Sequence, residues 1–154
     1  STDVNQLDHK IRLSRELPDI QGNCWWPGYM ITSNYKGIAE ALAEKLQSTV
    51  AIVPSYPWIG NIAPDEVAAL RQNGDELVWK APATDDVMQM ARAYVVYRFE
   101  AEETPDINNA EAIAGITYEP SFELADNDRG CTFIITVLDR ANNESAKGVA
   151  IIIK

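Results

Sequence analysis

The feature that most constrains the fold of this chain is a change in the spacing of its apolar residues. Before residue 47 they recur every three or four positions, as Val4, Leu7 and Ile11 do, which is the period of an amphipathic helix. From Glu66 onward they alternate at every second position, which is the period of a half-buried strand. The two periods predict two structural parts with a boundary near residue 63.

The pattern of residues 1–47 predicts a helix, a strand and a second helix. The first helix ends before Pro18, because the residue that precedes a proline avoids the helical region. The apolar run over 20–30 ends in Pro-Gly and predicts a strand that turns sharply. Ser33 or Asn34 is expected to cap the second helix. The apolar face of this helix holds Ile38, Leu42 and Leu46.

The remainder of the chain, residues 63–154, predicts a mainly β fold. The strongest turn signal is Asn73-Gly74, since both central positions of the hairpin loop that it favours need a positive φ. Short strands separated by turns at this spacing favour a β-sandwich. The strands are expected at 67–71, 76–80, 93–99, 112–118, 121–124, 131–138 and 149–153.

Between the two parts lies a connector, residues 50–62, that is rich in proline and aromatic residues. Prolines stiffen such a segment, and its aromatic side chains favour packing on a surface. The strand at 93–99 is apolar on both faces, which predicts a sheet covered on both sides. We expect residues 1–47 to pack on the sandwich, or to bury their exposed surface in a homodimer. The side chains predicted to pack between the domains are Tyr56, Trp58, Tyr97 and Phe99.

The charge of the chain disfavours two classes of partner. Lys and Arg number 13 against 23 Asp and Glu, which gives a net charge of −10. A nucleic-acid-binding protein normally gathers basic side chains that displace counterions from phosphates, and an anionic membrane surface is disfavoured for the same reason. A neutral ligand such as a glycan is compatible with this charge. No apolar run approaches the ~20 residues of a transmembrane helix.

The sequence holds little that could bind a metal or act as a nucleophile. Cys24 and Cys131 are predicted to be buried free thiols, with a disulfide between them as the alternative. Two cysteines and a single histidine, His9, cannot form a structural zinc site. Asp126-x-Asp128 could hold calcium with carbonyl oxygens, but acidic loop residues are more often solvated. We therefore predict no metal, no cofactor and no catalytic residue in this chain.

Residues 63–154 resemble a fibronectin type III domain. The resemblance rests on Trp79 in the second strand, Tyr94-x-Val96 in the third, and Phe133-x-Ile135-x-Val137-x-Asp139 in the sixth. In that family a tyrosine at the start of the sixth strand bonds back to the preceding corner. The matching position here is Cys131, whose thiol is a weak donor and cannot make that bond well.

Nearly the whole chain resembles the C-terminal end of the glycoside-hydrolase-like 10 family of bacterial envelope proteins. The matching strings are Gln6-Leu7, Pro18-x-Ile20-x-Gly22, Tyr56-Pro57-Trp58, Trp79-x-Ala81-Pro82, Ala93-Tyr94-Val95-Val96-Tyr97-Arg98-Phe99 and Thr136-Val137-Leu138-Asp139-Arg140-x-Asn142-Asn143-Glu144-Ser145. The last two strings are the most specific. The resemblance implies that residues 1–49 are the last helix–strand–helix portion of a TIM-like barrel, followed by the connector and the fibronectin type III-like domain.

The resemblance also implies a function. The parent protein would hydrolyse glycosidic bonds of polysaccharide or peptidoglycan glycan, outside the cytoplasm of a bacterium and anchored as a lipoprotein. A (β/α)₈ barrel needs ~200 residues, so the catalytic carboxylates would lie on barrel strands outside this chain. The chain itself would be a non-catalytic accessory fragment, with the glycan and the remainder of the barrel as its partners.

Trp25 and Trp26 are the candidate carbohydrate-binding residues of the parent barrel, because indole rings stack well on sugar faces. The alternative for both is core packing. The alternative function is a protein- or carbohydrate-binding module with no hydrolase role. An exposed aromatic row of Tyr97, Phe99 and Tyr118 would favour that module.

Overall fold

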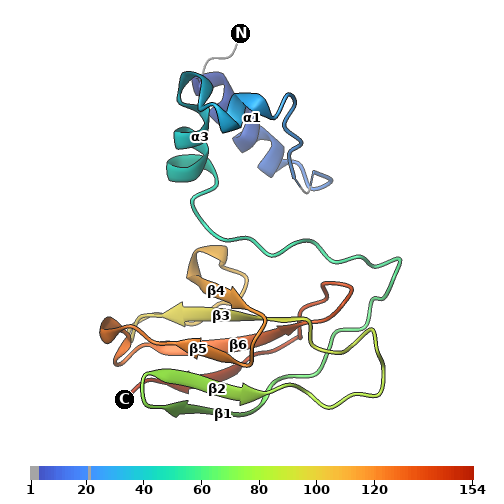
Figure 1. Cartoon of the computed structure of the whole chain (residues 1–154), viewed down its shortest axis with the longest axis vertical. Coiled ribbons are helices and arrows are strands. Elements are labelled where there is room, and N and C mark those ends of the chain that lie inside the picture. The colour runs from blue at the N-terminus through green and yellow to red at the C-terminus, as the bar shows by residue number, and fades with distance from the viewer. Residues whose placement is uncertain (1–3, 21) are drawn as a thin grey trace. The chain divides into compact units, whose positions relative to one another are not determined.

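The computed structural model of the protein describes residues 4–20 and 22–154. The chain divides into two compact units, Ser1–Thr49 and Val50–Lys154 (Figure 1). The division falls at the start of the predicted connector, so the connector belongs to the second unit. None of the helices in the described ranges has the length and hydropathy needed to cross a membrane.

The first unit is helical. Asn34 lies where a cap was expected, and its Oδ1 accepts bonds from the N–H groups of Ala39 and Glu40 at 3.0 and 3.3 Å. The buried side chains Ile11, Ile38, Leu42 and Leu46 form its core. The elements are α1 (Val4–Glu16), α2 (Tyr29–Thr32), the 3₁₀ turn η1 (Tyr35–Gly37), α3 (Ile38–Ala41) and the π-helical turn η2 (Leu42–Leu46).

The predicted strand in the first unit is wrong. The described residues between 20 and 28 form no strand, and the chain bends through Trp26-Pro27 into α2. A lone strand has no neighbour to pair with its N–H and C=O groups, and the two helices supply none. Of the predicted helix–strand–helix arrangement, the described residues form the helices but not the strand.

The second unit consists of two antiparallel sheets that form a β-sandwich. One sheet has the order β1-β2-β5 and the other β4-β3-β6-β7. The seven strands form where the sequence predicts them, with ends that differ by up to two residues. They are β1 (Ala68–Asn73), β2 (Glu76–Lys80), β3 (Ala93–Phe99), β4 (Ile113–Thr117), β5 (Ser121–Glu123), β6 (Thr132–Leu138) and β7 (Val149–Ile152), with 3₁₀ turns η3 (Ala110–Ala112) and η4 (Asp126–Asp128).

The turn between β1 and β2 lies one residue later than predicted. Asn73 pairs with Glu76, so the central residues are Gly74 and Asp75. Only Gly74 has a positive φ, of 64°. Glycine at the first central position is typical of a type II′ loop, in which Asn73 ends the strand.

The core between the two sheets holds the alternating residues that the sequence assigns to one face of each strand. Leu77 and Trp79 of β2 are buried there, and Trp79 meets Tyr94 edge-on at 5.3 Å between ring centroids. The inward face of β6 is confirmed. Its buried side chains are Phe133, Ile135 and Val137, continued by Cys131 just before the strand.

The outer face of β3 is buried as well, as its second apolar face predicts. Val95, Tyr97 and Phe99 form a second cluster with Leu138. Half-buried residues of the same unit pack on this cluster, among them Ile52 of the connector and Ile107 of the loop before β4. The connector is thus one of the segments that cover this sheet.

Candidate functional site

The connector is fastened to the loop that follows β6, residues 139–145, which we call the clamp loop. The N–H of Tyr56 donates to the carbonyl of Ala141 at 2.7 Å. The Nδ2 of Asn143 donates to the carbonyl of Gly60 at 3.0 Å and more weakly to that of Ile62 at 3.4 Å. A proline-rich segment without sheet pairing is therefore held in place by backbone and amide bonds.

The clamp loop is itself organised by Asp139, whose side chain is buried. Its Oδ1 accepts bonds from the N–H groups of Ala141 and Asn143, each at 2.8 Å, and its Oδ2 accepts from Asn143 Nδ2 at 2.9 Å. An aspartate that bonds the backbone two residues on forms a tight Asx turn. Asn142 completes the turn with a φ of 58°, a conformation that asparagine tolerates better than most residues.

Glu144 ties the clamp loop to the sandwich below it. Its Oε1 accepts bonds from the hydroxyl of Tyr97 at 2.8 Å and from that of Thr136 at 2.6 Å. Burial raises the pKa of Tyr97, and the bond to the Glu144 carboxylate raises that pKa further. The carboxylate of Glu144 is consequently held in one position at the edge of the connector.

Two cavities lie along the connector within the second unit. The larger, of about 360 Å³, has apolar walls from the connector and polar side chains from Asn61, Asn142, Asn143 and Glu144. The smaller, of about 220 Å³, also includes Asn61. The volume of the larger cavity is within the range of small-molecule sites, and Asn61 contributes to both cavities.

Asn142 gives the larger cavity an unpaired polar group. The residue is 4% exposed, and its Oδ1 accepts a bond from Nη1 of Arg92. That bond fixes the orientation of the amide, and its Nδ2 has no hydrogen-bond partner among the described residues. A buried donor left unpaired costs about 1–3 kcal/mol. An acceptor group at this wall of the cavity would offset that cost.

The smaller cavity is lined by two carboxylates, which is the residue type that glycoside hydrolysis requires. Asp86 uses its Oδ1 to accept the N–H of Met88 at 2.8 Å. Asp139 uses both oxygens within the clamp loop, as described above. Both acids thus organise the loops that carry them, Asp86 through one oxygen and Asp139 through both.

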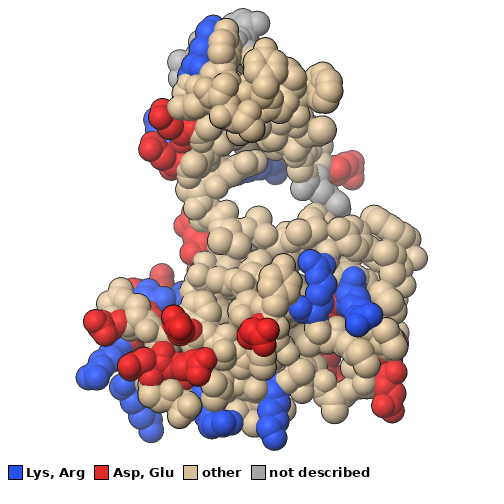
Figure 2. Space-filling model, in the orientation of Figure 1, with Lys and Arg blue, Asp and Glu red and all other residues tan. Residues whose placement is uncertain are grey.

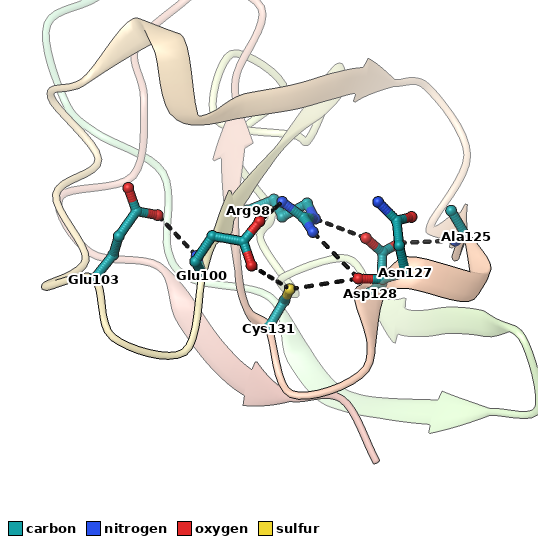
Figure 3. Close-up of polar contacts among 7 residues, drawn as sticks. All are labelled: Arg98, Glu100, Glu103, Ala125, Asn127, Asp128 and Cys131. Atoms are coloured by element: carbon teal, nitrogen blue, oxygen red, sulfur yellow. Dashed lines mark hydrogen bonds and ion pairs between the residues drawn. The ribbon is translucent and has the colours of Figure 1, made fainter.

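A second polar cluster lies at the corner between β5 and β6 (Figure 3). Arg98 of β3 donates from Nε to Asp128 at 2.7 Å and from Nη1 to Glu100 at 2.8 Å. Asp128 also accepts the N–H of Ala125 at 2.7 Å, and Cys131 Sγ lies 3.5 Å from Glu100. This ion-pair network stands where the fibronectin type III resemblance implies a tyrosine hydroxyl.

The cluster corrects the expectation that the acidic loop residues are only solvated. Asp128 is 5% exposed and fully engaged, so its oxygens are not free for the calcium ion considered above. The Asp128 and Glu100 carboxylates raise the pKa of Arg98, and Arg98 in turn lowers the pKa of Glu100. Across the described residues, no group of three or more His, Cys, Asp or Glu is placed to hold a metal.

The two cysteines are free thiols, so the disulfide alternative is wrong. Cys131 is buried as predicted, and burial is the main cause that raises the pKa of its thiol. Cys24 is exposed, which contradicts the prediction of a buried thiol. Its predicted environment depended on a strand that does not form.

The two residues of the predicted carbohydrate-binding pair have different surroundings in the structure. Trp25 is half-buried against the core of the first unit, while Trp26 is 91% exposed. Among the residues predicted for interdomain packing, Tyr56 and Trp58 are neighbours, with ring centroids 5.5 Å apart, and Trp58 is 78% exposed. The sugar-binding role of Trp25 and Trp26 and the packing role of Tyr56 and Trp58 stay predictions.

Tyr97 and Phe99, the other predicted packing residues, stack with centroids 6.5 Å apart and are both buried in the cluster that includes Ile52. Their role in packing against the first unit stays a prediction. The exposed aromatic row that would favour a binding module needs Tyr97, Phe99 and Tyr118 on the surface. Of these three residues Tyr118 is exposed, whereas Tyr97 and Phe99 are buried, so the row does not form.

Sequence reasoning missed the residues of the clamp loop. In the sequence, the string from Asp139 to Ser145 carries the family resemblance but no pattern that predicts a binding site. The available signal was an aspartate followed by two adjacent asparagines, residue types that bond nearby backbone groups. No local pattern predicts that Asn143 reaches back to Gly60, far away in the sequence.

Comparisons with known proteins connect the chain to glycoside hydrolases. It is 27% identical over 151 residues to "Glycosyl hydrolase YngK" of Bacillus subtilis (strain 168). The match covers 94% of this chain and 29% of that protein, so the chain spans less than a third of its relative's length. No family model matches the chain, and no solved structure matches it significantly.

Proposed function

We propose that this chain is a non-catalytic accessory region of a longer glycosidase-related protein. The observation that carries the proposal is the similarity to a glycosyl hydrolase, which extends over 94% of this chain and 29% of that protein. In this proposal residues 1–49 belong to the end of a TIM-like barrel, residues 50–62 are the connector, and residues 63–154 form a fibronectin type III-like domain. The parent protein would act on polysaccharide or peptidoglycan glycan.

Two features of the second unit support this domain assignment. Its strands divide three and four between two antiparallel sheets, an arrangement compatible with fibronectin type III-like sandwiches. Trp79 is buried against Tyr94, at positions that carry the resemblance to that family. The corner before β6 departs from the family pattern, with an arginine–carboxylate network near Cys131.

The accessory role is supported by the hydrogen bonds of the acidic residues that line the smaller cavity. Asp86 and Asp139 both accept backbone N–H bonds, which leaves them as structural groups. In the parent barrel, Trp25 and Trp26 would supply a sugar platform. The proposal includes a location outside the cytoplasm, on the bacterial envelope, because such a protein would meet its glycan there.

Two parallel assays test the proposal. The purified chain is incubated with chromogenic glycosides, polysaccharides and peptidoglycan, and the region of YngK that matches it is deleted from that protein. We expect no turnover by the chain, and a lower melting temperature or lower activity for the shortened YngK. Turnover of any of these substrates by the purified chain would overturn the accessory role.

The alternative, a binding module without a hydrolase role, is favoured by one observation, the exposed indole of Trp58, which directly precedes Ile59 of the smaller cavity in the chain. The same deletion separates the two functions. A pure binding module would leave the stability and turnover of the shortened YngK unchanged and would reduce only its retention on glycan.

A further inference from the structure

We propose that the connector and the clamp loop together form a binding site for a neutral glycan, with the larger cavity as the sugar pocket and the exposed Trp58 of the connector as a stacking surface. The choice of sugar as the ligand rests on the proposed function, but the site itself is built from contacts within the second unit. Four observations carry it: the charge of the segment, the preorganised polar groups, the unpaired amide and the exposed indole.

The connector is uncharged within a strongly acidic chain. Residues 50–64 contain no Lys, Arg, Asp or Glu, although the whole chain has a net charge of −10. This stretch runs along the second unit in Figure 1, where Figure 2 shows a broad area free of charged side chains. No Lys or Arg is among the described residues that line either cavity, although Arg92 bonds the lining residue Asn142. A neutral ligand fits this surface.

The polar groups of the larger cavity suit hydroxyl groups. Asn143 uses its Nδ2 on Gly60 and Asp139, which leaves the Oδ1 of its fixed amide as an acceptor. Glu144 is held through Oε1 by Tyr97 and Thr136. Side chains that are already fixed lose little conformational entropy when a ligand binds. A sugar hydroxyl both donates and accepts, so it can bond an amide oxygen, a carboxylate and an amide N–H together.

The remaining groups of the site are the amides of Asn142 and Asn61. Asn142 lines the larger cavity, and its buried Nδ2 has no hydrogen-bond partner among the described residues. Asn61 is exposed and borders both cavities. An oligosaccharide that fills the larger cavity would therefore extend across Asn61 toward the smaller one.

Trp58 supplies an exposed apolar surface on the same connector. It lies on a turn in which the N–H groups of Ile59 and Gly60 both bond the carbonyl of Tyr56, at 2.9 and 3.3 Å. The ring of Tyr56 supports its indole from one side, and Ile59 lines the smaller cavity. An indole that is 78% exposed yet held on a tight turn provides a stacking surface for a sugar ring.

The test is a titration of the whole isotope-labelled chain, followed by NMR, with neutral tetrasaccharides of N-acetylglucosamine and of glucose. Tetragalacturonate is the anionic comparison. We expect saturable shifts of the side-chain amide signals of Asn61, Asn142 and Asn143 with a neutral sugar. Asn61→Ala should raise Kd about fivefold and Trp58→Ala about tenfold, as expected for one lost hydrogen bond and one lost stacking contact. Both side chains are exposed, so neither variant should unfold the chain.

Tyr118→Ala is the matched control, because it removes an exposed aromatic ring outside the site. Its Kd should stay within about twofold of the parent value, since surface positions away from a site rarely matter. Absence of shifts with both neutral sugars, equal binding of tetragalacturonate, or an equal loss in the control overturns the site. These outcomes leave the proposed accessory function standing, because that function is tested by turnover and by deletion in YngK.

Discussion

Replacing Asn143 by alanine should loosen the connector without unfolding the sandwich. The amide of Asn143 bonds the Gly60 carbonyl at 3.0 Å and the Asp139 carboxylate at 2.9 Å. A neutral hydrogen bond contributes about 1 kcal/mol net, and one to a charged group about 1.5–3 kcal/mol. Because Asn143 is only half-buried and Asp139 keeps two backbone bonds, we expect a total loss of about 2 kcal/mol.

Hydrogen exchange followed by mass spectrometry measures this loss locally. The N–H groups of Tyr56, Ile59 and Gly60 are bonded in the clamped connector and exchange only when it opens. A loss of about 2 kcal/mol raises their exchange rates about thirtyfold. Amides in β3 should change much less, because the bonds of β3 to β6 along its whole length do not involve Asn143.

Asn108→Ala is the control for this experiment, since it removes an exposed asparagine whose Nδ2 bonds only Asp106. Its effect should be below about 0.5 kcal/mol, as for most surface substitutions. If Asn143→Ala leaves connector exchange within about threefold of the parent, the clamp bonds contribute little and the reasoning is refuted. If β3 and the connector accelerate equally, the connector opens only with the whole unit, and the idea of a separate clamp is wrong.

Three further predictions concern the cysteines and the corner before β6. Iodoacetamide at about pH 8 should modify Cys24 quickly and leave Cys131 unmodified in the native chain, as seen by intact mass, because Cys131 is buried and its pKa is raised. Asp128→Ala should lower the free energy of unfolding by about 3 kcal/mol in urea titrations, since it removes two bonds to a buried carboxylate, from Arg98 and from a backbone N–H. The bond from Arg98 lowers the pKa of Glu100 below 4.5, the ordinary value of a glutamate. The ionised Glu100 therefore contributes fully to stability above pH 4.5, and this contribution is lost as the pH falls through the folded-state pKa. The melting temperature of the parent should therefore fall more steeply between about pH 5 and about pH 3 than that of Glu100→Gln.

The strands of the second unit could be predicted because their evidence is local. Leu77 and Trp79, or Phe133 and Ile135, alternate inward along one strand, and each pair is buried in the structure. The run at 20–30 carries a similar apolar signal and forms no strand. The difference is pairing: a strand needs neighbours, and neighbours are not a property of the run itself.

The candidate site could be predicted only in part. The aromatic residues of the connector stand out in the sequence, and Trp58 is indeed exposed, directly before Ile59 of the smaller cavity in the chain. The partners of the connector do not stand out, because Asn143 and Gly60 are far apart in the chain and meet only once β6 has formed. Arg98 and Asp128 illustrate the same limit, since an acidic loop residue becomes buried only through a cation from another strand.

The positions of Asp128 and Asp139 decide whether these two acids could act together as a catalytic pair. They are the buried acidic residues of its described core, and each accepts backbone N–H bonds, one before β6 and one after it. Seven residues of extended chain between them span about 20 Å. Glycoside hydrolysis needs two carboxyl groups about 5–10 Å apart across the scissile bond. These two aspartates therefore cannot act as a catalytic pair with each other, and under the proposed accessory role their replacement should lower the stability of the sandwich without affecting turnover by the longer protein.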